Sequence, residues 1–166
     1  MSFFLKIPKE IMFHIMSYTY SPQLKELQND IIDYTRSVSF IKELYIAFWG
    51  GVWHLSPAES MDWLENDLIY YINNYEATNE GYTDHFYDVF MRSVQLNTRE
   101  KVIRMFKHRF GIRPIESDTL QNIHFIFGLL TIQERNDFIS GFMNFNEDQD
   151  RIVTQQQDAA AEQIEI

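Results

Sequence analysis

The histidines are the first side chains in this sequence that could coordinate a metal or carry acid–base chemistry. They lie far apart, and none forms H-E-x-x-H or any other pair at the spacing that metal ligands need. They are His14, His54, His85, His108 and His124. The chain has no cysteine, which excludes thiolate zinc sites, disulfides and cysteine nucleophiles. We therefore predict no metal site built on histidine or cysteine.

Carboxylates offer a second kind of chemistry, because they can coordinate divalent cations. The Asp84-His85 step and the acids around Asp62 and Asp67 are the candidates. No calcium loop, Gly-rich phosphate loop or G-x-S-x-G motif accompanies them. A site made of carboxylates alone would escape this search, so a small helical enzyme is our lowest-ranked alternative. We predict no catalytic residue, no cofactor and no metal.

Aromatic side chains are unusually abundant, with 14 Phe, 9 Tyr and 3 Trp among 166 residues. One group could form a stacking platform or an anchor for a protein partner. Its members are Phe48, Trp49, Trp53, Trp63, Tyr70, Tyr71 and Tyr75. The alternative is an ordinary core with a half-exposed rim, which is the more common fate of such residues. Trp49 and Trp53 flank Gly50-Gly51, so we expect these two to be partly exposed.

Charge is segregated along a chain whose net charge is −10. Eight acids and no Lys or Arg lie between Glu59 and Met91, whereas seven bases and one acid lie between Arg92 and Arg113. We expect helices of opposite sign to pack together and neutralise each other. The alternative is a basic face that binds phosphate or an acidic partner, formed by Lys101, Arg104, Lys107 and His108. Because the protein is strongly acidic, we do not favour nucleic acid as its partner.

The elements that would position these side chains are helices. Apolar residues recur at spacings of three and four, and no segment alternates with period two. Ser56 to Glu59 and Thr131 to Glu134 each match a capping box, which predicts a helix start. The fold class is all-α, a compact bundle of about eight helices over residues 1–145. Residues 146–166 are predicted to be a flexible, disordered acidic tail.

The expected helices follow the prolines and the caps. A first begins at Pro8, a second at Ser21-Pro22, and a third at about Ser37, which ends at Gly50-Gly51. The fourth and the eighth helices follow the two capping boxes. The sixth helix is expected to start at Thr98 or Asn97, and the seventh at Ser117 or Asp118. Gly111 is expected to end the sixth helix. Positions expected to face inward include Leu24, Leu27, Ile31, Tyr34, Phe40, Ile41, Tyr45, Leu64, Leu68, Phe86, Phe90, Val94, Val102, Phe106, Ile126, Phe127, Phe138, Phe142 and Met143.

Neither a membrane span nor a signal peptide is predicted. No apolar run approaches the roughly 20 residues that cross a bilayer. The opening residues lack a small-residue cleavage site and a long apolar stretch. We therefore expect an intracellular protein.

The amino-terminal segment Ile7 to Tyr18 resembles the opening of an F-box. Pro8, Glu10, Ile11, Ile15, Ser17 and Tyr18 match that pattern, and Ile7 replaces the usual Leu. The continuation Thr19-Tyr20-Ser21-Pro22-Gln23 departs from cellular F-boxes. It is more similar to short F-box-like proteins encoded by large double-stranded DNA viruses. The resemblance covers about 45 residues, and no leucine-rich, WD or kelch module follows it.

The resemblance implies a viral, non-enzymatic protein–protein interaction module with an F-box-like region over residues 1–50. Such a region would engage the adaptor subunit of a host ubiquitin ligase. The residues expected to bind this partner are Leu5, Ile7, Pro8, Ile11 and Ile15. They could instead face the protein's own helices. A structural component of a virus particle is the alternative function, so the implied location is the host cytoplasm, the nucleus or the virion.

Overall fold

The structure is a computed structural model that describes residues 9–11, 14, 24–110 and 118–146. The protein is all-α, and no residue in these ranges belongs to a β-strand. The chain divides into two units, residues 1–32 and 33–166. In the first unit, residues 9–11 and residue 14 are helical and exposed. The core and the aromatic pocket lie in the second unit.

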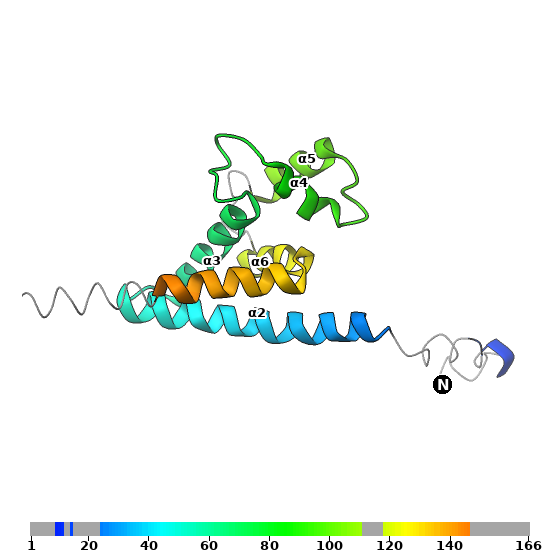
Figure 1. The fold of residues 1–166 in the computed structure, drawn as a ribbon, viewed down its shortest axis with the longest axis horizontal. Helices are drawn as coiled ribbons and strands as arrows, with labels where there is room; N and C mark the ends of the chain where they lie inside the picture. The colour runs from blue at the N-terminus through cyan, green and yellow to red at the C-terminus, as the bar shows by residue number, and fades with distance from the viewer. Residues whose placement is uncertain (1–8, 12–13, 15–23, 111–117, 147–166) are drawn as a thin grey trace, which may run out of the picture. The chain divides into compact units, whose positions relative to one another are not determined.

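The longest helix is α2, Lys25–Val52 (Figure 1). Its buried positions Val38, Ile41 and Tyr45 recur at spacings of three and four, which is the pattern of one helix face. The expected break before Ser37 is wrong, because this stripe continues in phase with Tyr34 one turn earlier. The expected stop at Gly50-Gly51 is also displaced, since α2 includes both glycines and ends at Val52.

The next helix, α3 (Pro57–Ile72), begins where the sequence predicts. The Glu59 backbone N–H donates to the Ser56 hydroxyl oxygen at 3.3 Å, and the Ser56 backbone N–H donates to the Glu59 carboxylate at 2.8 Å. This reciprocal pair is a complete capping box, which satisfies two donors that a helix start otherwise leaves open. Pro57 occupies the first turn, where its missing N–H has no cost.

Two shorter helices follow, α4 (Asp84–Met91) and α5 (Arg99–Phe110). Thr83 caps the first, and the Thr98 hydroxyl accepts from the Lys101 backbone N–H at 3.4 Å at the start of the second. Phe86, Val89 and Phe90 of α4 are buried as expected. Val94 is not, because α4 ends at Met91 and leaves this residue 92% exposed.

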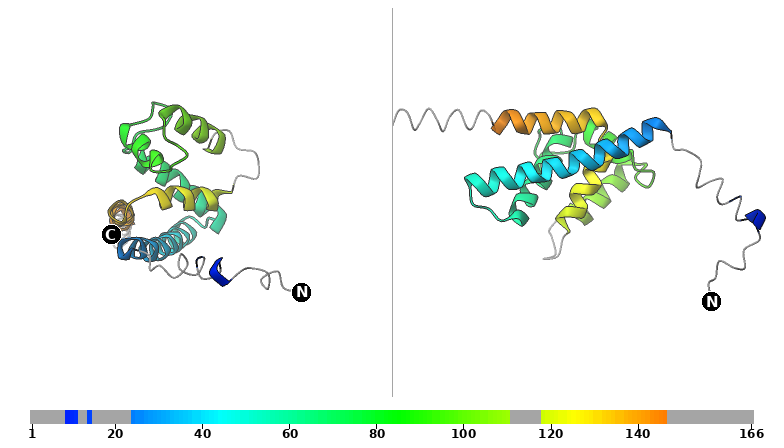
Figure 2. Two further views of the ribbon diagram at one scale, coloured as in Figure 1. Left: turned by 90° about the vertical axis from the view of Figure 1, so that its right-hand side faces the viewer. Right: turned by 90° about the horizontal axis from the view of Figure 1, so that it is seen from below.

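The last described helices are α6 (Thr119–Leu129), which Asp118 caps, and a helix over residues 132–146. The second capping box is also present, because the Glu134 backbone N–H donates to the Thr131 hydroxyl at 3.2 Å and the Thr131 N–H donates to the Glu134 carboxylate at 2.7 Å. Helix 132–146 runs beside α2, as two viewing directions show (Figures 1 and 2).

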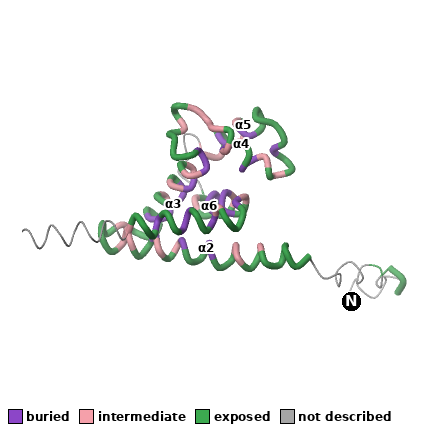
Figure 3. The backbone as a smooth tube through the Cα atoms, viewed as in Figure 1, coloured by how far each residue is buried: buried purple, intermediate pink, exposed green. Residues whose placement is uncertain are grey.

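The core of the second unit lies where α3 packs against α6, with α4 in contact with α3, α5 and α6. Every one of these helices, and α2, carries buried residues of this core (Figure 3). They include Ile41, Leu64, Leu68, Ile72, Phe86, Val89, Phe90, Val102, Ile123, Ile126 and Phe127. Phe138 and Phe142 join this core from helix 132–146.

Several positions expected to face inward are exposed instead. Leu24 directly precedes α2, and Leu27 and Ile31 lie in its first two turns; all three are exposed. The beginning of α2 is largely exposed (Figure 3). Phe40 is exposed because the neighbouring Ile41 occupies the buried face of α2, about 100° around the helix. Met143 is likewise one position beyond the buried Phe142.

Some predictions concern residues outside the described ranges. They are the helix start at Pro8 and its continuation through residues 15–18, the start at Ser21-Pro22, the helix end at Gly111, Ser117 as a helix start, and the tail from residue 147 onward.

Candidate functional site

An aromatic pocket of about 430 Å³ lies between α2, α3 and helix 132–146. Cavities of this size accommodate a small molecule or the side chains of a peptide. α2 contributes Tyr45 and Trp49, and α3 contributes Trp63, Asp67 and Tyr70. The remaining lining residues are Tyr75, Phe138, Gly141, Phe142 and Phe145. Eight of these ten residues are aromatic, so the wall offers broad apolar faces.

The two tryptophans of the pocket are stacked. The ring centroids of Trp49 and Trp63 are 4.8 Å apart and their planes are inclined by 13°. Phe48 meets the Trp49 ring edge-on at 5.1 Å. Trp63 is 45% exposed, so it presents apolar surface to solvent at the pocket. The Trp49 Nε1 donor is buried and has no hydrogen-bond partner within the described ranges. An unsatisfied buried donor is uncommon in folded proteins.

A carboxylate, Asp67, lies among these rings. The Tyr45 hydroxyl donates to its Oδ2 atom at 2.8 Å. Tyr45 is itself buried and stacks on Phe142 with centroids 4.0 Å apart. Burial raises the pKa of Asp67 above its ordinary value, although the hydrogen bond from Tyr45 opposes this. None of the described lining residues is a Lys or an Arg, so no lining cation compensates the charge of Asp67.

One side of the pocket is built by the loop that follows α3. Asn74 and Tyr75 both have positive φ, 53° and 62°, a region that a bulky side chain seldom adopts. The Tyr75 backbone N–H donates to the Tyr70 carbonyl at 2.8 Å, and the two rings meet edge-on at 5.6 Å. The loop therefore places Tyr75 beside Tyr70 at the cost of backbone strain.

The buried side chain of Asn73 holds this loop in place. Its Nδ2 donates to the carbonyls of Glu76 at 2.8 Å and Gly81 at 3.1 Å. Its Oδ1 accepts from the Thr83 backbone N–H at 2.9 Å. Asn73 thus ties the start of the loop to its end, directly before α4.

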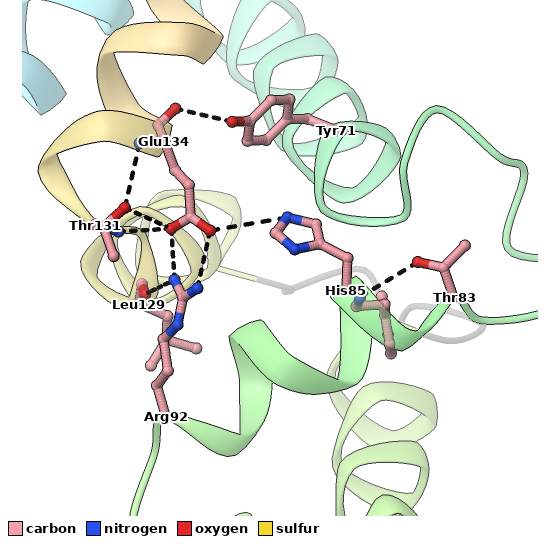
Figure 4. Close-up of polar contacts among 8 residues, drawn as sticks. Tyr71, Thr83, His85, Arg92, Leu129, Thr131 and Glu134 are labelled. Carbon is pink, nitrogen blue, oxygen red and sulfur yellow. Dashed lines mark hydrogen bonds and ion pairs between the residues drawn. The ribbon is translucent and has the colours of Figure 1, made fainter.

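A polar network around Glu134 joins helix 132–146 to α3 and α4 (Figure 4). The Arg92 guanidinium donates twice to the Glu134 carboxylate, at 2.5 and 2.8 Å, and once to the Leu129 carbonyl at 2.9 Å. The Tyr71 hydroxyl donates to the Glu134 carbonyl at 3.1 Å. Burial raises the pKa of Glu134, but hydrogen bonds from Arg92 and Thr131 outweigh it and bring the pKa to about 2.

This network acts as a structural clamp. His85 Nε2 lies 3.9 Å from the Glu134 carboxylate, beyond hydrogen-bond distance. Glu134 already accepts from Arg92 and Thr131, so its oxygens are engaged (Figure 4). The clamp keeps helix 132–146, and hence Phe138 and Phe142 of the pocket, fixed against α3.

The acidic and basic segments of the sequence meet in an ion pair between α4 and α5. Arg99 of α5 binds Asp84 of α4 at 2.6 Å, as the segregated charges predict. The four residues of the alternative, a basic face, are all exposed on α5, namely Lys101, Arg104, Lys107 and His108. Lys101 donates to the Asn97 side chain at 2.7 Å. Nothing in the described residues assigns a ligand to this face.

The predicted aromatic group is partly brought together. Four of its members line the pocket, namely Trp49, Trp63, Tyr70 and Tyr75. Trp53 is exposed near Trp49, with centroids 6.4 Å apart, and Phe48 and Tyr71 pack behind the lining on Phe142 and Phe138. The expectation that Trp49 and Trp53 are partly exposed is confirmed.

Sequence reasoning missed the contribution of helix 132–146. Phe138 and Phe142 were expected in the core, and no place at a pocket was predicted for Gly141 or Phe145. Gly141 and Phe142 follow Phe138 by three and four residues, which predicts that they share one helix face. This spacing does not predict which other helix that face contacts.

Of the predicted adaptor-binding residues, only Ile11 lies in the described ranges. Its side chain is 51% exposed. Leu5, Ile7, Pro8 and Ile15 lie outside those ranges, so their contacts are not assigned.

Within the described residues, no group of three His, Asp or Glu side chains is placed to hold a metal ion. None of the described helices combines the length and the apolar character needed to cross a bilayer. Comparison of the chain with models of known families, with curated proteins and with solved structures found no match.

Proposed function

We propose that this protein is a non-enzymatic protein–protein interaction module that binds a partner through the aromatic pocket. The observation that carries the proposal is the stacked pair Trp49 and Trp63, one half-buried and one 45% exposed, at the wall of a cavity of about 430 Å³. Interface hot spots are enriched in Trp and Tyr that fill or form such pockets.

The rigidity of the wall supports the same proposal. Asn73 fixes the loop of Tyr75, and the Glu134 clamp fixes helix 132–146. A pocket whose walls are held by the fold loses little conformational entropy when a partner binds. A rigid aromatic pocket therefore binds a partner more tightly than a flexible one with the same contacts.

A site-specific photo-crosslink tests this proposal. The crosslinking amino acid p-benzoylphenylalanine is placed at Tyr70, or at Phe40 as a control, and the protein is irradiated in cells that express it. Phe40 is 44% exposed against 46% for Tyr70, and it does not line the pocket. We expect one defined partner crosslinked from Tyr70 and not from Phe40. Equal or absent crosslinks from Tyr70 would contradict the pocket as a binding centre.

A second candidate function is binding of a host ubiquitin-ligase adaptor by the F-box-like segment. The half-exposed side chain of Ile11 supports it, because an adaptor-binding residue must be accessible. We expect Ile11→Asp to abolish capture of the adaptor subunit. Val52→Asp is the control, since Val52 is 53% exposed and lies elsewhere.

If the wild-type protein captures no adaptor at micromolar concentration, the F-box proposal is wrong. Recovery of other virus-particle proteins with Tyr70 would then favour the alternative, a structural component of a virion. Adaptor capture that depends on Ile11 would add a second binding segment, whereas crosslinked virus-particle proteins would identify the partner of the pocket.

A further inference from the structure

The aromatic pocket combines features that select one kind of side chain. Asp67 is the single acidic residue among its described lining residues, and no base stands with it. The surrounding sequence from Glu59 to Met91 also contains no Lys or Arg. A cation from outside would therefore meet a carboxylate and several ring faces with no repulsion from a neighbouring base.

The same chain shows how such a combination is used. In α4, Asp84 and Tyr87 are three residues apart and hold one guanidinium between them. The Arg99 side chain binds the Asp84 carboxylate at 2.6 Å and lies 4.4 Å from the centre of the Tyr87 ring. In α3, Asp67 and Tyr70 have the same three-residue spacing and line the pocket. Residues three apart share one helix face, so both pairs present a carboxylate beside a phenol ring.

A second internal example involves a buried cation. Arg135 binds the Asp33 carboxylate at 2.7 Å and lies 5.6 Å from the centre of the Tyr34 ring. In both examples the cation is a guanidinium. Its planar group can stack on a ring while its N–H groups bond a carboxylate, which an ammonium does less well.

We infer that the pocket binds an arginine side chain of the partner protein, with the guanidinium between Asp67 and the rings of Trp63 and Tyr70. This inference rests on the proposed function and names the side chain that the pocket receives. Asp67 uses Oδ2 to accept from Tyr45, which orients the carboxylate. Trp63 supplies the most strongly cation-binding type of ring, on a half-exposed face.

The test is a titration of the full chain, followed by NMR, with the peptide acetyl-Gly-Arg-Gly-amide. The matched control peptide carries citrulline, which has the shape of arginine without its charge. We expect the arginine peptide to shift the indole N–H signals of Trp49 and Trp63, and citrulline to bind weaker by on the order of tenfold. Arginine binding should also lower the pKa of the Asp67 carboxyl in the wild-type protein, because a nearby cation favours the ionised form.

Two charge-neutralising variants complete the test. Asp67→Asn should weaken binding of the arginine peptide by on the order of tenfold and leave that of the citrulline peptide unchanged. Asp88→Asn removes the same charge from an exposed position outside the pocket and should change neither. The wild-type titration of Asp67 keeps the inference testable if Asp67→Asn does not fold.

The inference is overturned if the two peptides bind equally, if neither shifts the tryptophan signals, or if the pKa of Asp67 does not fall. The proposed function has a separate outcome, because it depends on the crosslink from Tyr70. A crosslinked partner without arginine selectivity would leave the pocket as a binding site and remove only arginine as its occupant.

Discussion

Trp63 of α3 stacks on Trp49 of α2, with ring centroids 4.8 Å apart and planes inclined by 13°. One member of the pair supports the wall and the other faces solvent. Trp49 also contacts Phe48 and Trp53, whereas Trp63 is 45% exposed. The two rings therefore have separable roles, in stability and in binding.

Alanine substitution should separate these roles. We expect Trp49→Ala to lower the free energy of unfolding by about 2 kcal/mol, because it removes a ring packed on three others. Trp63→Ala should cost no more than about 1 kcal/mol, since much of that ring is already in water. Urea unfolding measures both values, and the reverse order would show that Trp63 carries the packing.

The loop that carries Tyr75 should depend on Asn73. Asn73→Ala removes three hydrogen bonds between a buried amide and partly buried backbone groups, so we expect a loss of about 3 kcal/mol. The Tyr75 ring should also become more mobile, which NMR relaxation of its ring protons can detect. Asn79→Ala is the control, because Asn79 is an exposed asparagine of the same loop and its side chain makes none of these bonds. A neutral Asn73→Ala would show that the loop is held by other contacts.

Acid should weaken the clamp between Arg92 and Glu134. The pKa of Glu134 is lowered from 4.5 to about 2, so its ionised form stabilises the folded state. That stabilisation is fully present above the ordinary pKa and is lost as the pH falls from 4.5 towards about 2. We expect Glu134→Gln to flatten this part of the curve of unfolding free energy against pH.

Glu59→Gln is the matched control for that experiment. Glu59 is also the acid of a capping box, but no arginine in the described part of the chain forms an ion pair with it, as Arg92 does with Glu134. The pH dependence should therefore change more in Glu134→Gln than in Glu59→Gln. Equal changes would attribute the effect to capping alone.

Arg135 should be indispensable to the second unit. Its side chain is 1% exposed, binds Asp33 at 2.7 Å, and donates to the Phe127 carbonyl at 3.3 Å. We expect Arg135→Met to cost about 3 kcal/mol, because it breaks a largely buried ion pair while keeping the volume of the side chain. Adding Asp33→Asn should recover part of this loss. No recovery in the double variant would mean that the pair contributes little beyond packing.

The sequence predicts much of the fold because local signals state it directly. The side chains that cap helix N-termini in the structure are Ser56, Thr83, Asp118 and Thr131. The sequence predicts a helix start at each of them except Thr83. The break within α2 was predicted wrongly. Glycines at its end cost about 1 kcal/mol each within a helix, which the packing of Tyr45 and Trp49 on their neighbours offsets.

The pocket is less predictable than the helices. Aromatic residues such as Trp49 and Trp63 stand out by type, but their stacking depends on how α2 and α3 align in space. Helix 132–146 adds Phe142 and Phe145 from almost a hundred residues away, and local sequence carries no information about that contact. The sequence analysis names the Asp67 carboxylate as a candidate cation ligand. It does not predict the aromatic rings around Asp67, because tertiary packing brings them there.

The central claim is that the aromatic pocket binds the partner, and the affinity of the partner crosslinked from Tyr70 tests it most directly. Calorimetry would compare the wild-type protein with Trp63→Ala and with Phe40→Ala, two exposed aromatic positions of 45% and 44% exposure. We predict that Trp63→Ala weakens binding tenfold or more, about 1.4 kcal/mol, whereas Phe40→Ala leaves it within about twofold. Equal affinities of the two variants, or a larger loss in Phe40→Ala, would contradict the claim.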